Sequence, residues 1–150
     1  MMILDPPKKP EVSVFIDGAA RGNPGPAGIG IVVKKGPETL LEIDEYVGKI
    51  TNNQAEYQAL IRGLEEVLFL GYKSAHFYSD SELLVNQIKG EYKIKKEHLK
   101  PLNLHAKILI KKFDHFSIAH AHREENKRAD KLANQALDKL SKADSPLFNF

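Results

Sequence analysis

Two aspartates stand directly after short apolar runs: Asp17 ends VSVFID, and Asp80 ends AHFYSD. A single aspartate in such a place usually only forms a turn or caps a helix. In an open α/β sheet, however, ligands bind beyond the carboxyl ends of the parallel strands. If the two runs form neighbouring parallel strands, their carboxylates lie side by side at one edge of the sheet.

Two more carboxylates begin apolar stripes that have helical spacing. Glu56 is followed on its stripe by Leu60 and Leu64, and Asp130 is followed by Leu137. A glutamate near a helix N-terminus also interacts favourably with the helix dipole, but this explains an exposed side chain better than an inward one. We therefore expect Glu56 and Asp130 to face the two aspartates.

Four converging carboxylates repel one another and raise at least one pKa unless a cation lies between them. Hard divalent ions fit, because Mg²⁺ prefers oxygen ligands and keeps several waters. Two ions ~4 Å apart suit in-line displacement at phosphorus, with one activating the attacking water and the other stabilising the leaving oxygen. The sequence has no GxxxxGK[ST] loop. The pattern predicts phosphodiester chemistry that depends on two Mg²⁺ or Mn²⁺ ions.

The spacing of apolar residues predicts the strands and helices that position the four carboxylates. Three strand-like runs come first, at 12–17, 28–34 and 39–47, with a glycine- and proline-rich loop at 18–27. No helix separates them, so an antiparallel meander is expected. Helices are then predicted at 53–70, 82–89, 97–112 and 125–140, and strands at 75–79 and 115–121. This order predicts an α/β fold: a five-stranded mixed sheet with strands one, four and five parallel and helices on both faces.

The composition is that of one folded domain: 150 residues, of which 42% are hydrophobic and 28% charged. We expect a leader at 1–10, a domain at 11–141 and a tail at 142–150. The lack of cysteine excludes disulfides, thiol catalysis and thiolate zinc sites. No apolar run reaches the ~20 residues of a membrane span, and no signal pattern is present, so we expect a cytoplasmic monomer without a membrane partner.

The tail ends in SPLFNF, which is apolar for a chain end. We expect Leu147, Phe148 and Phe150 to pack back onto the domain, where each buried side chain contributes ~1.5–3 kcal/mol. The alternative is a short hydrophobic peptide that binds a replication partner such as a sliding clamp.

Basic residues gather in one segment. Residues 89–112 hold eight lysines against two glutamates, a local net charge of +6, which leaves −4 for the rest of the chain. One interpretation is a solvated amphipathic helix. The other is a phosphate-binding surface beside the acidic site, to which Lys93, Lys95 and Lys96 would contribute.

Four blocks of the sequence together resemble the signature of type 1 ribonuclease H: 17–28 (DGAARGNPGPAG), 51–60 (TNNQAEYQAL), 78–88 (YSDSELLVNQI) and 123–133 (REENKRADKLA). The blocks occur in the family's order. The resemblance implies that Asp17, Glu56, Asp80 and Asp130 are catalytic and bind the metals. It also implies endonucleolytic cleavage of RNA in RNA–DNA hybrids, leaving 3′-hydroxyl and 5′-phosphate ends.

The same resemblance implies a set of substrate-binding residues. Asn23, Asn52 and Asn53 match positions that contact the minor groove of the hybrid, and amides can donate to and accept from a 2′-hydroxyl. Gly18 and Gly22 would let the backbone approach the nucleic acid, although a plain tight turn also fits them.

The sequence departs from the family pattern in three places. Glu82 stands where many members have glutamine, and its carboxylate accepts hydrogen bonds but cannot donate them. A short lysine-rich segment replaces the tryptophan-bearing basic protrusion. The loop before the last helix is short, with His120, His122 and Arg123 nearby. These features resemble the compact subgroup, some of which also cleave double-stranded RNA. His122 would assist proton transfer, or Arg123 would hold a phosphate.

Two other functions share this fold and its acidic site. A DNA-cleaving relative, such as an integrase or a junction resolvase, is disfavoured because the TNN and GNPGP blocks match residues that contact RNA. A non-catalytic hybrid-binding module is disfavoured because phosphate binding alone gains nothing from four carboxylates.

Overall fold

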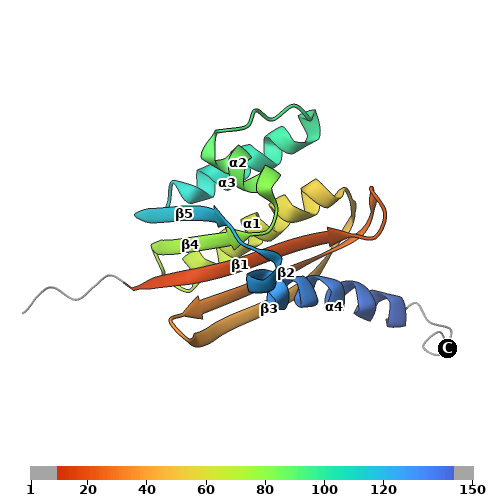
Figure 1. Cartoon of the computed structure of the whole chain (residues 1–150), viewed down its shortest axis with the longest axis horizontal. Helices are drawn as coiled ribbons and strands as arrows, with labels where there is room; N and C mark the ends of the chain where they lie inside the picture. Colours follow the sequence, from red (N-terminus) through yellow and green to blue (C-terminus); the bar gives the residue numbers. More distant parts are fainter. Residues whose placement is uncertain (1–9, 144–150) are drawn as a thin grey trace, which may run out of the picture.

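A five-stranded mixed sheet forms the centre of the molecule (Figure 1). The computed structural model describes residues 10–143, so the expectations for the leader and for Leu147, Phe148 and Phe150 lie outside the described residues. The strands are β1 (Glu11–Ala20), β2 (Gly25–Lys35), β3 (Glu38–Ile50), β4 (Ser74–Ser79) and β5 (His115–His120). Their order is β3-β2-β1-β4-β5; the β1–β2 and β2–β3 pairs are antiparallel, and β1–β4 and β4–β5 are parallel. The predicted topology is confirmed.

Helices cover both faces of the sheet, as predicted. They are α1 (Asn52–Phe69), α2 (Glu82–Lys89), α3 (Lys100–Ile110) and α4 (Lys127–Ala143), with 3₁₀ turns at Glu97–Leu99 and Arg123–Asn126. The first three pack on one face and α4 packs on the other (Figure 1). Within residues 10–143, no helix is both long and apolar enough to cross a membrane.

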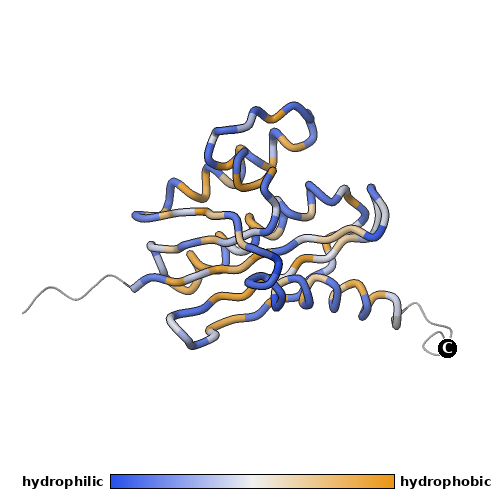
Figure 2. Tube along the Cα trace, in the orientation of Figure 1, coloured by the Kyte–Doolittle hydropathy of each residue, from blue (hydrophilic) through white to orange (hydrophobic). Residues whose placement is uncertain are grey.

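The alternating side chains of β1 supply both cores. Val12, Val14 and Ile16 belong to the large core under α1, whereas Phe15 points the other way and packs against the small core under α4. Figure 2 shows apolar residues concentrated along the strands and hydrophilic residues along the loops. The sheet is therefore buried on both sides around β1, where the predicted site residues begin.

The register of β1 and β4 places the two aspartates next to each other. The parallel pairing ends at Ile16 opposite Ser79, and Asp17 and Asp80 are the residues that follow. The β1 strand itself runs on to Ala20, because its other edge stays paired with β2. The prediction that the strand ends at residue 17 and that 18–27 is a loop is therefore wrong, since only 21–24 lie outside the strands.

Two predicted helices also begin later than the sequence indicates. The helix expected at 97–112 starts with a 3₁₀ turn, and α3 proper begins at Lys100 with Pro101 in its first turn, where a missing N–H costs nothing. The helix expected at 125–140 is likewise preceded by the 3₁₀ turn Arg123–Asn126. The apolar period does not distinguish a 3₁₀ turn from the α-helix that continues it.

Glycines let α4 lie directly on the sheet. A Cβ placed on Gly30 would stand 2.0 Å from the backbone oxygen of Ala129, and one on Gly28 would stand 2.4 Å from that of Ala133. No larger residue fits at either position without moving the helix. The distance between α4 and β2 is thus set by backbone contact, and this fixes the height of Asp130 above the sheet.

Candidate active site

A single cavity at the carboxyl edge of β1 and β4 gathers the four predicted carboxylates. We call it the acidic cavity; its volume is about 500 Å³. It is lined by Asp17, Gly18, Ala19, Asn52, Glu56, Asp80, Arg123 and Asp130. Two strands, two helices and the segment after β5 therefore meet at one place, as the sequence predicts.

Asp17 lies deepest in the acidic cavity, with only 7% of its surface exposed. Burial, the negative charge of Asp80 and hydrogen bonding to Asp130 raise the pKa of Asp17 from 3.8 to about 9. Without a cation, the Asp17 carboxyl therefore keeps a proton at neutral pH and shares it with its neighbours.

Glu56 is the second perturbed carboxyl. Burial raises its pKa from 4.5 to about 7. Hydrogen bonds from Ser81 and Asn52 lower this pKa, and the charge of Asp80 raises it. Two acids with raised pKa values in one cavity are a common mark of a functional site.

The N-terminus of α1 is fixed in two ways, and this places Glu56 in the acidic cavity. Thr51 and Gln54 form a capping box, in which the backbone nitrogen of Gln54 donates to the Thr51 hydroxyl oxygen at 3.2 Å. Gly18 lies against the first turn of the helix, where an added Cβ would be 2.3 Å from the carbonyl carbon of Ala55. Gly18 therefore has a packing role that the sequence alone did not reveal.

Asn52 connects this helix to the β1–β2 hairpin. Its side-chain oxygen accepts from the Ala20 amide at 3.2 Å, and its side-chain nitrogen donates to Glu56 at 3.2 Å. Its backbone nitrogen donates to the side-chain oxygen of Asn23 at 3.1 Å. Asn23 and Asn52, both predicted to contact substrate, are thus already part of a network that orients Glu56.

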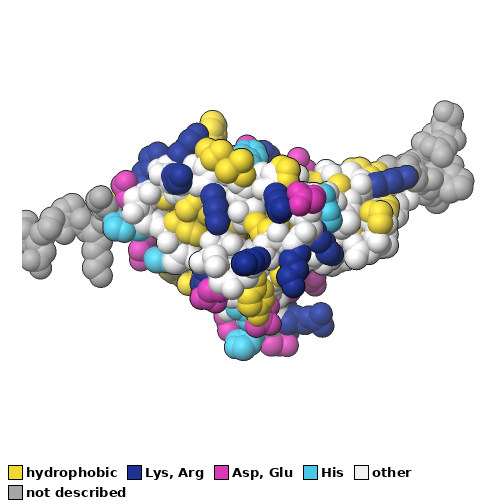
Figure 3. Space-filling model, turned by 90° about the horizontal axis from the view of Figure 1, so that it is seen from above, with side chains coloured by type: hydrophobic (Ala, Val, Ile, Leu, Met, Phe, Trp, Pro, Cys, Tyr) yellow, Lys and Arg dark blue, Asp and Glu magenta, His cyan; other side chains and the backbone are white. Residues whose placement is uncertain are grey.

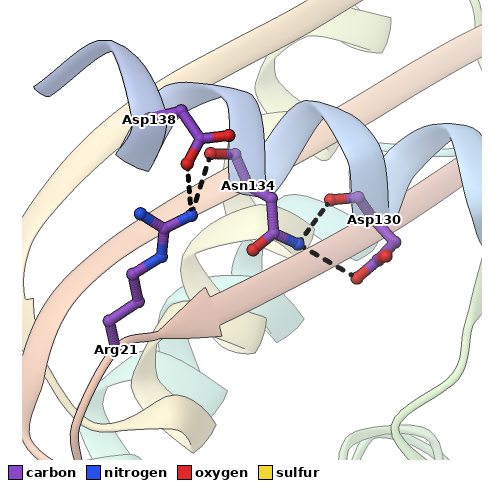
Figure 4. A network of polar contacts seen from close by, with 4 residues as sticks. All are labelled: Arg21, Asp130, Asn134 and Asp138. Carbon is purple, nitrogen blue, oxygen red and sulfur yellow. Dashed lines mark hydrogen bonds and ion pairs between the residues drawn. The ribbon is translucent and has the colours of Figure 1, made fainter. Parts of the chain in front are cut away.

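Asp130 lies on the exposed side of the cavity and is held by its own helix. The Asn134 side-chain nitrogen donates to the Asp130 backbone oxygen at 3.0 Å and to its carboxylate at 3.4 Å (Figure 4). One turn further, Asp138 pairs with Arg21 at 2.6 Å. This ion pair ties the β1–β2 loop, which carries Asn23, to the helix that carries Asp130.

The donor set of the acidic cavity fits hard divalent cations. It offers carboxylate and amide oxygens, which suit Mg²⁺ or Mn²⁺ better than soft metals. Within residues 10–143, however, no group of three or more His, Asp or Glu side chains lies close enough together to hold a metal ion as the structure stands. Hydrogen bonding to Asp130 and Asp80 contributes to the raised pKa of Asp17, and a cation bound among these carboxylates would take the place of the protons.

The predicted lysines line a second cavity beside the first. This lysine groove, also about 500 Å³, is lined by Asn53, Leu83, Gln87, Glu91, Tyr92, Lys93, Lys95, Lys96 and Leu99. Asn52 lines the acidic cavity and Asn53 the lysine groove, so the N-terminus of α1 separates the two. Seen from the side of α2 and α3, basic side chains alternate with apolar ones (Figure 3). Residues 90–96 of the basic segment therefore form a loop over a groove, and the helix α3 makes up only its second half.

The remaining predicted residues lie at the edges of the two cavities. Glu82 is exposed in the first turn of α2 and lines neither cavity. Gly22 adopts a φ of 103° in the β1–β2 loop, a conformation that favours glycine. It therefore shapes the turn that presents Asn23, which leads into a cis peptide bond with Pro24.

His120, which ends β5, and His122, which follows it, do not line the acidic cavity, whereas Arg123 does. His120 lies with its Nε2 atom 3.2 Å from the Asp80 backbone oxygen. His122 is exposed, and its ring meets that of His120 edge-on at 6.1 Å. The Arg123 guanidinium therefore lies where the acidic cavity opens to it, and the His122 imidazole does not. Phosphate binding by Arg123 and proton transfer by His122 both stay predictions.

Two residues at the site were missed by sequence reasoning. Ser81 caps α2 by accepting from the Leu84 amide at 3.2 Å and also hydrogen-bonds Glu56. A serine directly before an apolar helix is a recognisable N-cap signal. Asn126 is buried and donates to the Ile16 backbone oxygen at 2.9 Å. Nothing in its local sequence indicates such a long-range bond.

Comparisons with known proteins agree with this geometry. The family described as Reverse transcriptase-like matches residues 15–136. Ribonuclease HI of Halobacterium salinarum is 39% identical over 137 residues, covering 91% of this chain and 69% of that protein. Bifunctional protein Rv2228c of Mycobacterium tuberculosis is 40% identical over 130 residues, 85% of this chain and 36% of that protein. The crystal structure of LC11-RNase H1 in complex with RNA/DNA hybrid has a TM-score of 0.82 at 41% identity, covering 87% of this chain and 99% of that chain.

The mixed sheet and its acidic cavity are those of a ribonuclease H-like hydrolase. The chain belongs to the type 1 ribonuclease H family.

Proposed function

We propose that this protein cleaves the RNA strand of RNA–DNA hybrids internally and leaves 3′-hydroxyl and 5′-phosphate ends. The observation that carries the proposal is the acidic cavity, in which four carboxylates from four elements converge and two have raised pKa values. The complex of LC11-RNase H1 with an RNA/DNA hybrid supports the choice of substrate.

In this proposal, the four carboxylates hold two divalent cations. When bound, such ions polarise the phosphate and lower the pKa of a coordinated water. Asp17 and Asp80 lie side by side beyond the last β1–β4 pair and supply the central ligands, and Glu56 and Asp130 complete the set from either side. Asn52 and Ser81 hold the Glu56 carboxylate in place, and Arg123 meets the phosphate.

The hybrid lies across the N-terminus of α1 in this proposal. Asn53 lines the lysine groove and its neighbour Asn52 lines the acidic cavity, so one helix end contacts both regions. The Asn23 nitrogen and the Asn53 amide face the RNA strand and pair with 2′-hydroxyls. Lys93, Lys95 and Lys96 hold backbone phosphate across the groove.

One experiment tests the reaction against its alternatives. The protein is incubated with labelled hybrid, duplex RNA, single-stranded RNA and duplex DNA in Mg²⁺, Mn²⁺ or EDTA. We expect hybrid cleavage with either metal and none in EDTA, and cleavage of duplex RNA would extend the substrate range. Cleavage of duplex DNA alone would favour a resolvase-like enzyme, and binding without any cleavage would favour a hybrid-binding module.

The lysine groove gives a prediction about salt. Replacing Lys93, Lys95 and Lys96 by alanine should raise KM and flatten the dependence of log Kd on log salt by about one unit for each lost phosphate contact. The measurement is a salt titration of hybrid binding in Ca²⁺, which permits binding without turnover.

The matched control removes the same charge from α3 and the turn that follows it, outside the groove. Lys107, Lys111 and Lys112 do not line either cavity. Their triple alanine variant should keep most of the wild-type slope. If both triple variants showed the same slope of log Kd against log salt, the lysines of the groove would not bind phosphate specifically, and the interpretation as a solvated surface would hold.

His122 gives a second prediction. If the imidazole moves a proton as product leaves, His122→Ala should lower kcat about 10- to 100-fold with KM little changed. His115, at the start of β5, is an exposed histidine for a control variant. A wild-type kcat for His122→Ala between pH 6 and 9 would show that this form works without a histidine.

A further inference from the structure

Asn126 has a buried side-chain amide whose nitrogen donates one hydrogen bond and whose oxygen accepts none among the described residues. It is 1% exposed, and its nitrogen donates to the Ile16 backbone oxygen at 2.9 Å. Its side-chain oxygen is buried and has no partner among the described residues. The orientation of the amide is fixed by chemistry, because the Ile16 carbonyl can only accept and so must face the nitrogen.

The choice of asparagine is not explained by stability. A buried acceptor without a partner costs at least as much free energy as one neutral hydrogen bond returns. An apolar side chain of similar size would avoid the cost of the unpaired oxygen, although the Ile16 carbonyl would then lose this donor. Because the unpaired oxygen of Asn126 costs as much as its one hydrogen bond contributes, we look for a reason other than stability for an asparagine at this position.

The location of the bond supplies that reason. Ile16 is the last residue of β1 opposite β4, and its carbonyl belongs to the peptide that leads into Asp17. Asn126 directly precedes α4, and Asp130 lies one helical turn further along. The bond therefore joins the backbone of one carboxylate to the start of the helix that carries another.

Elsewhere α4 is held by backbone contact with Gly28 and Gly30, which sets its distance from the sheet, and by ion pairs with Arg21, Glu42 and Asp44. Those ion pairs join long side chains at the surface, so each holds the helix only loosely. The Asn126 bond fixes the position of the helix along the strand, because the amide must meet a single carbonyl. Together these contacts determine the Asp17 to Asp130 separation.

We propose that Asn126 is a positioning residue, which holds Asp130 at the distance from Asp17 that a shared divalent cation requires. This inference rests on the proposed function for the identity of the cation. Loss of outer partners of metal ligands typically weakens metal affinity or activity 10- to 100-fold. The loss is expected without any change in the four carboxylates themselves.

The test compares Asn126→Leu with Asn103→Leu. Asn103 is a matched control, since it is also buried and hydrogen-bonded, but to the Tyr57 hydroxyl in the core under α3. Mn²⁺ binding to the metal-free protein is measured by calorimetry, and kcat and KM are measured on hybrid. For Asn126→Leu we expect Mn²⁺ affinity and kcat to fall about 10-fold or more, with KM within about threefold. Asn103→Leu should keep the wild-type Mn²⁺ affinity at a temperature where both variants are folded.

Equal Mn²⁺ affinity for wild type and Asn126→Leu would overturn the proposal. If that variant does not fold, Asn126→Gln keeps the donor but displaces it by one methylene, and a wild-type Mn²⁺ affinity there would overturn the proposal equally. The proposed function fails separately: a wild-type protein that binds Mn²⁺ but cleaves no hybrid contradicts it and leaves the Mn²⁺ comparison valid.

Discussion

Asp17→Asn and Asp80→Asn should each reduce hybrid cleavage below about a tenth of the wild-type rate, even at saturating metal. Each substitution removes one ligand charge at the centre of the acidic cavity and leaves the shape of the side chain unchanged. Because the buried Asp17 must take up a proton when the metal-free chain folds at neutral pH, the amide also removes that cost. The metal-free variants should therefore stay folded, with a melting temperature at or above that of the wild type.

The control for this experiment is Asp44→Asn. Asp44 pairs with Lys139 at 2.7 Å and with Gln135 at 2.9 Å, between β3 and the outer part of α4. Its variant should lose some stability and keep its activity. If either Asp17→Asn or Asp80→Asn retained more than a tenth of wild-type cleavage, those residues would not be the central ligands.

The second large effect concerns stability and pH. In the metal-free protein, the free energy of unfolding should fall as the pH rises from about 5 to 9. The pKa of Asp17 is raised to about 9 and that of Glu56 to about 7 in the folded state, whereas both acids ionise near pH 4 when the chain unfolds. The folded state thus holds more protons over this range, and each pKa unit corresponds to about 1.4 kcal/mol. Summed over the two acids, the loss of unfolding free energy between pH 5 and 9 is on the order of several kcal/mol.

Other carboxylates act in the opposite direction at lower pH. Hydrogen bonding to Arg128 lowers the pKa of Glu42, and hydrogen bonding to Lys139 lowers that of Asp44. Their stabilisation is present above the ordinary carboxyl pKa and is lost as the pH falls through their lowered values. Stability without metal should therefore be greatest in mildly acid solution.

Thermal unfolding in EDTA across this pH range measures the effect. Asp17→Asn should flatten the decline, because it removes the group with the largest raised pKa. Mn²⁺ should raise the melting temperature more at pH 8 than at pH 6, since the metal competes with protons for the same carboxylates. A decline that is equally steep in Asp17→Asn would show that other groups cause it.

Much of the fold was predictable because its elements have clear periods. The change from alternation in VSVFID to helical spacing after Glu56 predicts both the meander and the parallel half of the sheet. The same patterns predict that Asp17 and Asp80 meet, since that needs only neighbouring parallel strands. The meeting is confirmed by the pairing of Ile16 with Ser79.

The prediction of secondary structure was wrong where the local amino-acid composition is typical of a loop but the residues pair with a neighbouring strand. Gly18 and Ala20 belong to a glycine-rich stretch typical of loops, yet they continue β1 because β2 pairs with them. The roles of Asn52 and Asn126 could not be predicted, because each depends on a hydrogen bond to a residue distant in the chain. Local sequence contains no information about such partners.

The acidic cavity draws its carboxylates from the first strand and from the last helix. Asp17 and Asp130 are separated by most of the chain, and the β1–β4 pairing between them is also long-range. Long-range pairing of this kind forms slowly, because a long loop must close before the contact stabilises it. A chain still being synthesised, with α4 not yet made, lacks its fourth ligand. Hybrid cleavage is therefore expected only after α4 has been synthesised and has docked on the sheet.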